Sequence, residues 1–354
     1  MISARVRLFI PALLLAGCSA TAPLPAAIVP TPAPPLVQVA PVNVRIGIAL
    51  GGGAAKGFAH IGVIKMLEAN GLIPEVVAGT SAGSLVGALY ASGMDVFRLQ
   101  QNAVALDETG IRDMSLFSGG LIKGQRLQDY VNEMVGQRPF QRLPKRFAVV
   151  ATRLDTGART VFARGNVGQA VRASCSIPGL FEPARIGNAT YVDGGLVSPV
   201  PVDAARELGA DIVIAVDISS KASGQAPDSL LGVVNQSIKI MGQKLGQQEL
   251  ARADIIIRPN VNNIGPVEFE QRGNAIIEGE KAALRALPQI RAKIASVRAQ
   301  LVKADADRIA RAAAERRARE NAAREASTPP PCRSPGLIGG LFGSTVECPP
   351  TAQR

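Results

Sequence analysis

The segment Gly79-Thr80-Ser81-Ala82-Gly83 places a serine at the centre of a G-x-S-x-G pattern. It follows the apolar run Val76-Val-Ala and precedes a helix-like stretch from Ser84 to Ala91. A strand that turns sharply into a helix pushes such a serine outward as a nucleophile elbow. Ser81 is therefore a candidate catalytic nucleophile, and a plain tight turn is the alternative interpretation.

The base that would activate Ser81 is less obvious, because the chain contains a single histidine, His60. His60 begins a predicted helix among apolar neighbours, and it precedes Ser81, against the chain order Ser, Asp, His of α/β-hydrolases. We therefore expect a packed, hydrogen-bonded histidine. Two aspartates remain: Asp193, between a strand-like run and two glycines, and Asp217, at the end of the apolar strand 212–216. A partly desolvated carboxylate that contacts a serine can act as general base, although an Asp-Gly turn also explains Asp193.

A glycine-rich loop, Gly51-Gly52-Gly53-Ala54-Ala55-Lys56-Gly57, lies between the first predicted strand and the first predicted helix. Its bare N–H groups and the following helix N-terminus form an anion cradle. A phosphate-binding loop would need Lys-Ser or Lys-Thr after the last glycine, and a dinucleotide fingerprint would need glycine at Lys56. The alternative is an oxyanion hole built from Gly51, Gly52 and Gly53, which fits acyl transfer at Ser81.

The glycine loop, Ser81 and the candidate aspartates can act together only if the fold brings them to the same edge of a sheet. Short apolar runs alternate with helical patterns from Arg45 to about Pro259, which predicts a three-layer α/β/α fold with a mainly parallel central sheet. In such sheets, sites form at the carboxyl ends of the strands. We expect this globular domain to span residues 44–288.

The N-terminal residues are typical of an export signal. Two arginines, a short apolar segment from Leu8 to Leu15 and small residues precede Cys18, and Leu15-Ala-Gly-Cys18 resembles a bacterial lipobox. We expect a signal peptide at 1–17, lipidation of Cys18, and a Pro/Ala-rich linker at 18–43. This implies a lipid-anchored protein of the bacterial envelope, with Ser19 compatible with the outer membrane.

Residues 291–325 account for +5 of the net charge of +11, and the rest is spread thinly along the chain. Residues 291–325 hold ten Lys or Arg against five Asp or Glu, without aromatic residues or a nucleic-acid-binding motif. We predict a basic, Ala-rich surface helix at 289–326. A more specific interpretation is that this helix is attracted to anionic lipid. We predict no nucleic-acid partner. A Pro/Gly-rich tail at 327–354 carries Cys332 and Cys348, which could pair in an oxidising compartment, and leaves Cys175 as an inert buried thiol.

Four ordered motifs resemble those of the patatin-like phospholipases. They are the glycine loop with Lys56, the Gly79–Gly83 segment, the Asp193-Gly-Gly motif, and the block from Ala173 to Pro183, which is similar to the family's A-S-x-x-x-P-x-x-F-x-P pattern. The resemblance is clear over about residues 44–220. It implies a Ser81–Asp193 dyad with no histidine, and it favours Asp193 over Asp217.

The function implied is that of a serine lipid acyl hydrolase of the phospholipase A or lysophospholipase type, a carboxylic ester hydrolase acting on phospholipid or another lipid ester. Lys56 is expected either to orient a phosphate head group or to cap local structure. We expect no metal and no cofactor, because no clustered ligand pattern occurs in the sequence. The alternatives are a non-catalytic envelope lipoprotein that binds lipid or a protein through the same fold, and a peptidase on a similar fold.

Overall fold

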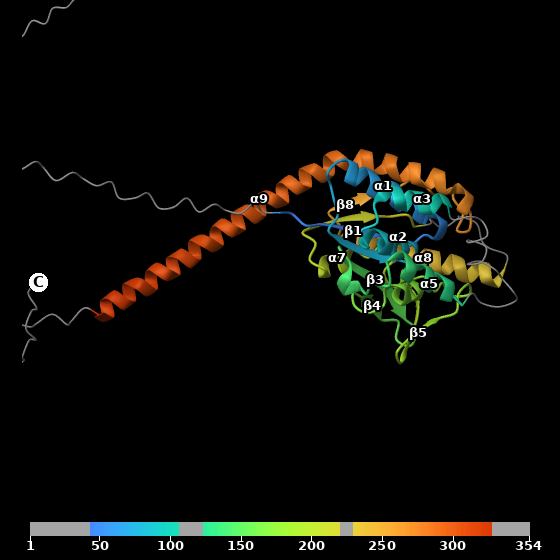
Figure 1. Cartoon of the computed structure of the whole chain (residues 1–354), viewed down its shortest axis with the longest axis horizontal. Helices are drawn as coiled ribbons and strands as arrows, with labels where there is room; N and C mark the ends of the chain where they lie inside the picture. The colour runs from blue at the N-terminus through green and yellow to red at the C-terminus, as the bar shows by residue number, and fades with distance from the viewer. Residues whose placement is uncertain (1–42, 106–122, 220–228, 328–354) are drawn as a thin grey trace, which may run out of the picture. The chain divides into compact units, whose positions relative to one another are not determined.

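A computed structural model describes residues 43–105, 123–219 and 229–327 (Figure 1). The strands of these residues form an eight-stranded sheet in the order β5-β6-β3-β2-β1-β7-β8, with β4 paired to β3. Their bounds are β1 Ile46–Leu50, β2 Val76–Thr80, β3 Arg146–Arg153, β4 Arg159–Phe162, β5 Ala184–Ile186, β6 Ala189–Asp193, β7 Ile212–Val216 and β8 Ile255–Ile257. The helices are α1 Phe58–Ala69, α2 Ala82–Ala91, α3 Val96–Ala105, α5 Gln125–Met134, α6 Val167–Ser174, α7 Val202–Glu207, α8 Leu230–Leu250 and α9 Arg272–Ser327.

The centre of the sheet is parallel. Strands β3, β2, β1, β7 and β8 pair in parallel, and β4, β5 and β6 add antiparallel pairs at the β3 side. Every residue of β1, β2 and β7 is buried, as expected for strands that are covered on both faces. The predicted α/β class with a mainly parallel sheet is therefore confirmed.

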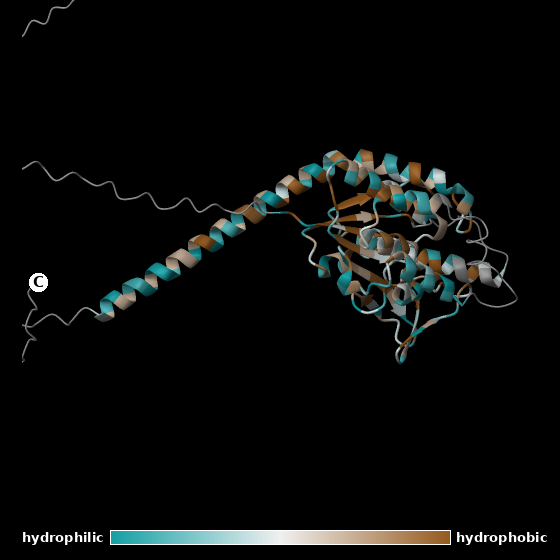
Figure 2. Cartoon of the chain, in the orientation of Figure 1, coloured by the Kyte–Doolittle hydropathy of each residue, from teal (hydrophilic) through white to brown (hydrophobic). Residues whose placement is uncertain are grey.

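Helices cover both faces of the sheet. Ile48 and Leu50 of β1 pack into a core shared with α1, α2 and α9, whereas Ala49 between them packs into a second core with α7 and the end of α8. This split follows from the alternation of side chains along a strand. Figure 2 shows the hydrophobic colouring concentrated on the strands, between the two helical layers.

The register on β3 brings the end of β2 next to the end of β6. Thr80, the last residue of β2, pairs with Val150, and Asp193, the last residue of β6, pairs with Ala151. β4 pairs with both Val150 and Ala151 along one side of β3. A strand residue has one partner strand on each side, so β2 and β6 must both lie along the opposite side of β3, one after the other. The two strands approach from opposite directions and end at adjacent positions of β3.

The C-terminal helix begins earlier than the sequence predicted. A single helix, α9, runs from Arg272 to Ser327 through Pro288, so the expected boundary at residues 288 and 289 falls inside it. Its first part packs on α1 and buries Ile276, Ala283 and Ile290, whereas every residue after 305 is exposed. The apolar positions of the first part explain the difference, because they extend the domain core into a helix that continues beyond it.

Several predicted features lie outside the described residues. These are the signal peptide, Cys18, the linker up to residue 42, and the tail with Cys332 and Cys348. Among the described residues, no helix combines the length and the apolar character needed to cross a bilayer.

Candidate active site

Ser81 lies at a sharp turn between β2 and α2. Its backbone has φ 51° and ψ −124°, which is strained for a residue with a side chain. The turn packs tightly against the first strand, because a Cβ on Gly83 would come within 2.1 Å of the Leu50 carbonyl oxygen. The second glycine of the motif is thus required by close backbone contact, and the geometry is that of the predicted elbow.

Asp193 meets the serine directly. Ser81 Oγ donates a hydrogen bond of 2.6 Å to Asp193 Oδ2, and both side chains are buried. The contact follows from the register on β3, which ends β2 and β6 side by side. The backbone N–H of Gly195 donates to the other carboxylate oxygen at 2.7 Å and fixes the orientation of the carboxyl group. No imidazole stands between the two groups.

Burial sets the proton affinity of Asp193. Desolvation raises the pKa of its carboxyl group from 3.8 to about 6, while the hydrogen bonds from Ser81 and Gly195 oppose this shift. A carboxylate with this pKa is ionised at neutral pH and is a stronger base than an exposed one. This is the property that a general base beside a serine needs.

Two further residues hold the elbow in place. Ser81 N–H donates to Ser174 Oγ at 2.8 Å, and Ser174 Oγ donates to the Val150 carbonyl at 2.6 Å. Thr80 Oγ1 donates to the Ser198 carbonyl at 2.8 Å. Ser174 belongs to the Ala173–Pro183 block of the sequence, but only the structure shows that its hydroxyl positions the backbone of the nucleophile.

Glu249, near the end of α8, has a role that sequence reasoning missed. Its carboxylate is buried, accepts a bond of 2.8 Å from Val200 N–H, and accepts another from Ser198 Oγ. Burial raises the pKa of Glu249 to about 7. The turn that it holds contacts both Thr80 and the glycine loop, so Glu249 supports the two parts of the site from behind.

The glycine loop lies against the serine, but its N–H groups are not equivalent. Gly51 N–H donates to the Val216 carbonyl and Gly52 N–H to the Pro199 carbonyl, at 3.1 and 3.0 Å. For Gly53 N–H, the described residues contain no acceptor. Of the three predicted oxyanion donors, Gly51 and Gly52 are therefore engaged in holding the loop, and Gly53 remains available.

The backbone N–H of Ala82 is a second available donor. Ala82 is the first residue of α2, where helix N–H groups have no intrahelical acceptor, and no other acceptor for it is found in the described part of the chain. It follows the nucleophile directly, the position that supplies an oxyanion donor at such elbows. Gly53 and Ala82 thus supply two N–H groups near Ser81 that have no acceptor among the described residues.

The remaining candidates have structural partners. His60 is fully buried, and its Nε2 lies 2.8 Å from the Gly51 carbonyl oxygen. Burial lowers the pKa of the imidazole to about 4, so the ring is neutral at neutral pH and donates its Nε2–H to this oxygen. Asp217 accepts bonds from Ser219 and forms an ion pair with Arg258. Cys175 is a free, buried thiol, and desolvation raises its pKa to about 12. The predictions of a packed, hydrogen-bonded histidine and of a buried thiol are confirmed.

Lys56 is more enclosed than a head-group contact requires. Only 3% of it is exposed, and burial lowers the pKa of its amino group. It does not line the cavity at Ser81. Its burial and its absence from the described walls favour the second of the two predicted roles, a structural one within the loop.

A cavity of about 200 Å³ opens onto the pair. Besides Ser81, Asp193 and Gly53, its walls include mostly apolar side chains: Ile177, Pro178, Leu196, Pro199, Ile238 and Pro266. An apolar chain attached to an ester carbonyl is the chemistry that such walls accept. Among the described residues, no group of three or more His, Cys, Asp and Glu side chains is arranged to hold a metal ion.

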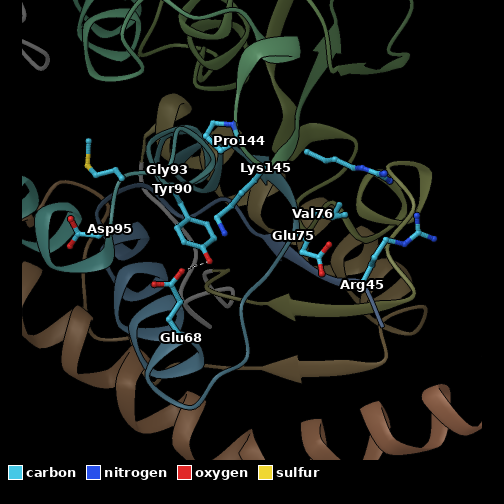
Figure 3. A pocket seen from close by; sticks show the side chains of 11 residues that line it. Arg45, Glu68, Glu75, Val76, Tyr90, Gly93, Asp95, Pro144 and Lys145 are labelled. Carbon is cyan, nitrogen blue, oxygen red and sulfur yellow. Dashed lines mark hydrogen bonds between the residues drawn. The ribbon is translucent and has the colours of Figure 1, made fainter. Parts of the chain in front are cut away.

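A larger cavity, of about 490 Å³, lies at the opposite edge of the sheet (Figure 3). Arg45, Val76 and Arg146, at the amino ends of β1, β2 and β3, contribute to its walls. Tyr90 donates to Glu68 at 2.7 Å, as the dashed line in Figure 3 shows, and no Ser, Thr or Cys lines the cavity. The described walls of this cavity therefore offer no serine, threonine or cysteine nucleophile.

Comparison with known proteins agrees with this geometry. Residues 48–206 match the family model described as patatin-like phospholipase. The chain contains a patatin-like phospholipase domain. The matched span runs from β1 into α7 and thus includes the glycine loop, Ser81 and Asp193.

Curated proteins are similar to this chain over part of their length. An uncharacterised NTE family protein of Mycobacterium tuberculosis is 34% identical over 202 residues, which is 56% of this chain and 56% of the relative. A second one is 30% identical over 271 residues, 68% of this chain and 46% of the relative. A protein named lysophospholipase NTE1, from Pyricularia oryzae, is 27% identical over 70% of this chain and 18% of its own length. The chain thus spans about half the length, or less, of these relatives.

Among solved structures, the chain is similar to VipD from Legionella pneumophila, with a TM-score of 0.49 and 16% identity over 70% of this chain and 67% of VipD. It is also similar to the type III effector protein ExoU, with a TM-score of 0.37 and 18% identity over 70% of this chain and 54% of ExoU.

Proposed function

We propose that the protein is a serine lipid acyl hydrolase of the phospholipase A or lysophospholipase type. The observation that carries this proposal is the 2.6 Å hydrogen bond between Ser81 Oγ and the buried carboxylate of Asp193, at a strained elbow that faces an apolar cavity. The patatin-like phospholipase domain and the relative named a lysophospholipase support a lipid ester as the substrate.

In the proposed mechanism, Ser81 attacks the ester carbonyl while Asp193 accepts its proton. The C–O bond to the alcohol then breaks, the protonated Asp193 returns the proton to the leaving oxygen, and the acyl group stays on Ser81. A water molecule, deprotonated by Asp193, attacks the acyl-enzyme; the bond between the acyl carbon and Ser81 Oγ breaks, Asp193 returns the proton to Ser81 Oγ, and the fatty acid leaves. The N–H groups of Gly53 and Ala82 would stabilise the negative oxygen of each tetrahedral intermediate.

We also propose that the protein acts at a membrane surface of the bacterial envelope. This rests on the lipobox-like sequence before Cys18 and on the charge excess of residues 291–325. A lipidated Cys18 would hold the domain near its substrate, and the charge excess would strengthen contact with anionic lipid.

Labelling and hydrolysis test the proposed function together. The purified protein should react with a fluorophosphonate probe and release fatty acid from lysophospholipid, whereas Ser81→Ala should do neither. A probe that fails to label Ser81 would favour the non-catalytic alternative. Cleavage of peptides combined with no hydrolysis of long-chain esters would favour the peptidase.

The pH dependence tests the base. Because Asp193 must be ionised to accept a proton, we expect kcat/KM to fall as the pH drops below about 6, approaching tenfold per pH unit. Glu249 titrates nearby, with its pKa raised to about 7, so the profile should also be measured for Glu249→Gln. An acid limb that stays near pH 6 in this variant assigns it to Asp193, and a limb that disappears contradicts that assignment.

A further inference from the structure

A second cavity adjoins the one at Ser81. It measures about 440 Å³, and it shares Ser219 and Gln243 with the first cavity, so these two residues form the partition between them. Both cavities lie at the carboxyl ends of parallel strands: Ser81 follows β2, Asp217 follows β7 and Arg258 follows β8. A ligand held at Ser81 can therefore extend into the second cavity without crossing the sheet.

The two cavities differ in chemistry. The walls around Ser81 are mainly apolar, whereas the second cavity presents four side-chain amides, those of Gln243, Gln247, Asn260 and Asn262. Among the described residues, none of these amides has a hydrogen-bond partner. Each amide offers both a donor and an acceptor, which is what hydroxyl and phosphate-ester oxygens require. The pair of cavities thus matches an amphiphile with an apolar chain and a polar head.

Arg258 gives the second cavity a fixed cationic group. Its Nε donates to Asp217 Oδ2 at 3.1 Å, and the other oxygen of Asp217 accepts from Ser219 N–H and Oγ at 3.1 and 2.6 Å. The two terminal nitrogens of the guanidinium group form no hydrogen bond within the described residues, and the side chain is 59% exposed. A guanidinium group anchored through Nε leaves these nitrogens free for bidentate contact with a phosphate.

Arg258 and Lys239 supply positive charge at the two cavities. The charged side chains that the described residues contribute to the walls are Lys239, Arg258, Asp193 and Asp217. These two cations and two carboxylates balance, so attraction for a phosphodiester depends on direct contact with Arg258 rather than on an excess of positive charge. The oxygens of Asp217 are already engaged by Ser219 and by Nε of Arg258.

We propose that the second cavity binds the phosphate-bearing glycerol head group of the lipid substrate while the acyl ester lies at Ser81. The phosphate contacts the terminal nitrogens of Arg258, and the glycerol oxygens contact the amides of the partition and of the segment after β8. This inference rests on the proposed function and specifies its substrate class as glycerophospholipids. A neutral lipid of the same chain length would leave the guanidinium group and the amides without a ligand partner.

Two substrates with the same acyl chain isolate the head group. Monoacylglycerol and lysophosphatidylglycerol share the chain and the ester, but only the second carries a phosphate. We expect wild-type protein to prefer lysophosphatidylglycerol in kcat/KM, and Arg258→Gln to reduce this preference about tenfold, mainly through a higher KM, as for a lost charge-assisted hydrogen bond. The double variant Asn260→Ala/Asn262→Ala, at exposed positions, should reduce the preference by a smaller factor without relying on the Asp217 ion pair.

Arg252→Gln is the matched control. Arg252 is a partly exposed arginine that pairs with Asp203 and lines neither cavity, so its loss should leave the preference unchanged. Equal catalysis of both substrates by the wild type, or an equal loss on both substrates in Arg258→Gln, would overturn the head-group site and leave the hydrolase function standing. A wild-type protein that hydrolyses neither substrate and no p-nitrophenyl ester would overturn both.

Discussion

Asp193→Asn should reduce ester hydrolysis by roughly 10³-fold or more, because an amide cannot accept the proton of Ser81. The substitution preserves the size of the side chain and can retain the hydrogen bond from Gly195 N–H at one oxygen. The loss should therefore appear in kcat, measured with a soluble p-nitrophenyl ester, while the fold persists.

The stability of the same variant gives an independent check. Folding raises the pKa of Asp193 from 3.8 to about 6, so its contribution to stability is present below pH 4 and is lost as the pH rises through 6. At pH 8 the buried carboxylate costs about 3 kcal/mol, calculated from this shift. Asp193→Asn removes that cost, and its thermal midpoint at pH 8 should be at least that of the wild type.

Asp217→Asn is the control for the base assignment. Asp217 ends a strand at the same edge of the sheet, but its oxygens bind Ser219 and Arg258 rather than Ser81. Asp217→Asn should therefore leave kcat for the p-nitrophenyl ester close to that of the wild type. If Asp217→Asn removes activity and Asp193→Asn keeps most of it, Asp217 is the base and the Ser81–Asp193 mechanism is wrong.

Gly62→Ala and Gly279→Ala should each destabilise the domain strongly. The two glycines lie where the backbones of α1 and α9 are in close contact. A Cβ on Gly62 would lie 2.0 Å from the Ile276 carbonyl oxygen, and a Cβ on Gly279 would lie 2.0 Å from the Ala59 carbonyl oxygen. Since both obstacles are backbone atoms, the helices must separate, at a cost of about 3 kcal/mol in the free energy of unfolding. Urea unfolding, followed by circular dichroism, measures it.

Gly273→Ala provides a control in the same helix. A Cβ at Gly273 meets no atom within 4 Å, and alanine is favoured over glycine within a helix by roughly 0.5–1 kcal/mol. This variant should be as stable as the wild type or slightly more stable. If Gly279→Ala unfolds at the same urea concentration as Gly273→Ala, α9 does not pack on α1 through these glycines.

Helix α9 has two parts with different surroundings. Its first part, with Gly279, Ala283 and Ile290, belongs to the domain core, and Lys65 of α1 forms an ion pair with Glu280 across the contact. Beyond residue 305 the helix is exposed throughout. Composition shows the basic, helical character of the second part, but it does not show that the helix begins inside the core.

The sequence by itself determined the features that depend on local chemistry. The apolar strands, the turn at Ser81, the glycine loop and the class of the fold follow from patterns within short windows, because a strand buried on both faces needs a continuous apolar run and a tight elbow needs small residues. The apolar residues around His60 in the chain also indicated a packed histidine, whereas its hydrogen-bond partner, the Gly51 carbonyl, comes from the structure. The choice of Asp193 over Asp217 came only from the resemblance of four ordered motifs to a family.

Tertiary structure decided what depends on distant contacts. Asp193 reaches Ser81 because β6 runs antiparallel along β3 and ends one residue from the point where β2 ends, a register that no short window contains. The N–H groups of Gly51 and Gly52 donate to the distant Val216 and Pro199 carbonyls, whereas Gly53 N–H has no acceptor among the described residues, so of the three predicted oxyanion donors only Gly53 is available. Glu249 and Arg258 lack any local signal for the same reason: each acquires its role from groups that the sheet brings to its edge from other parts of the chain.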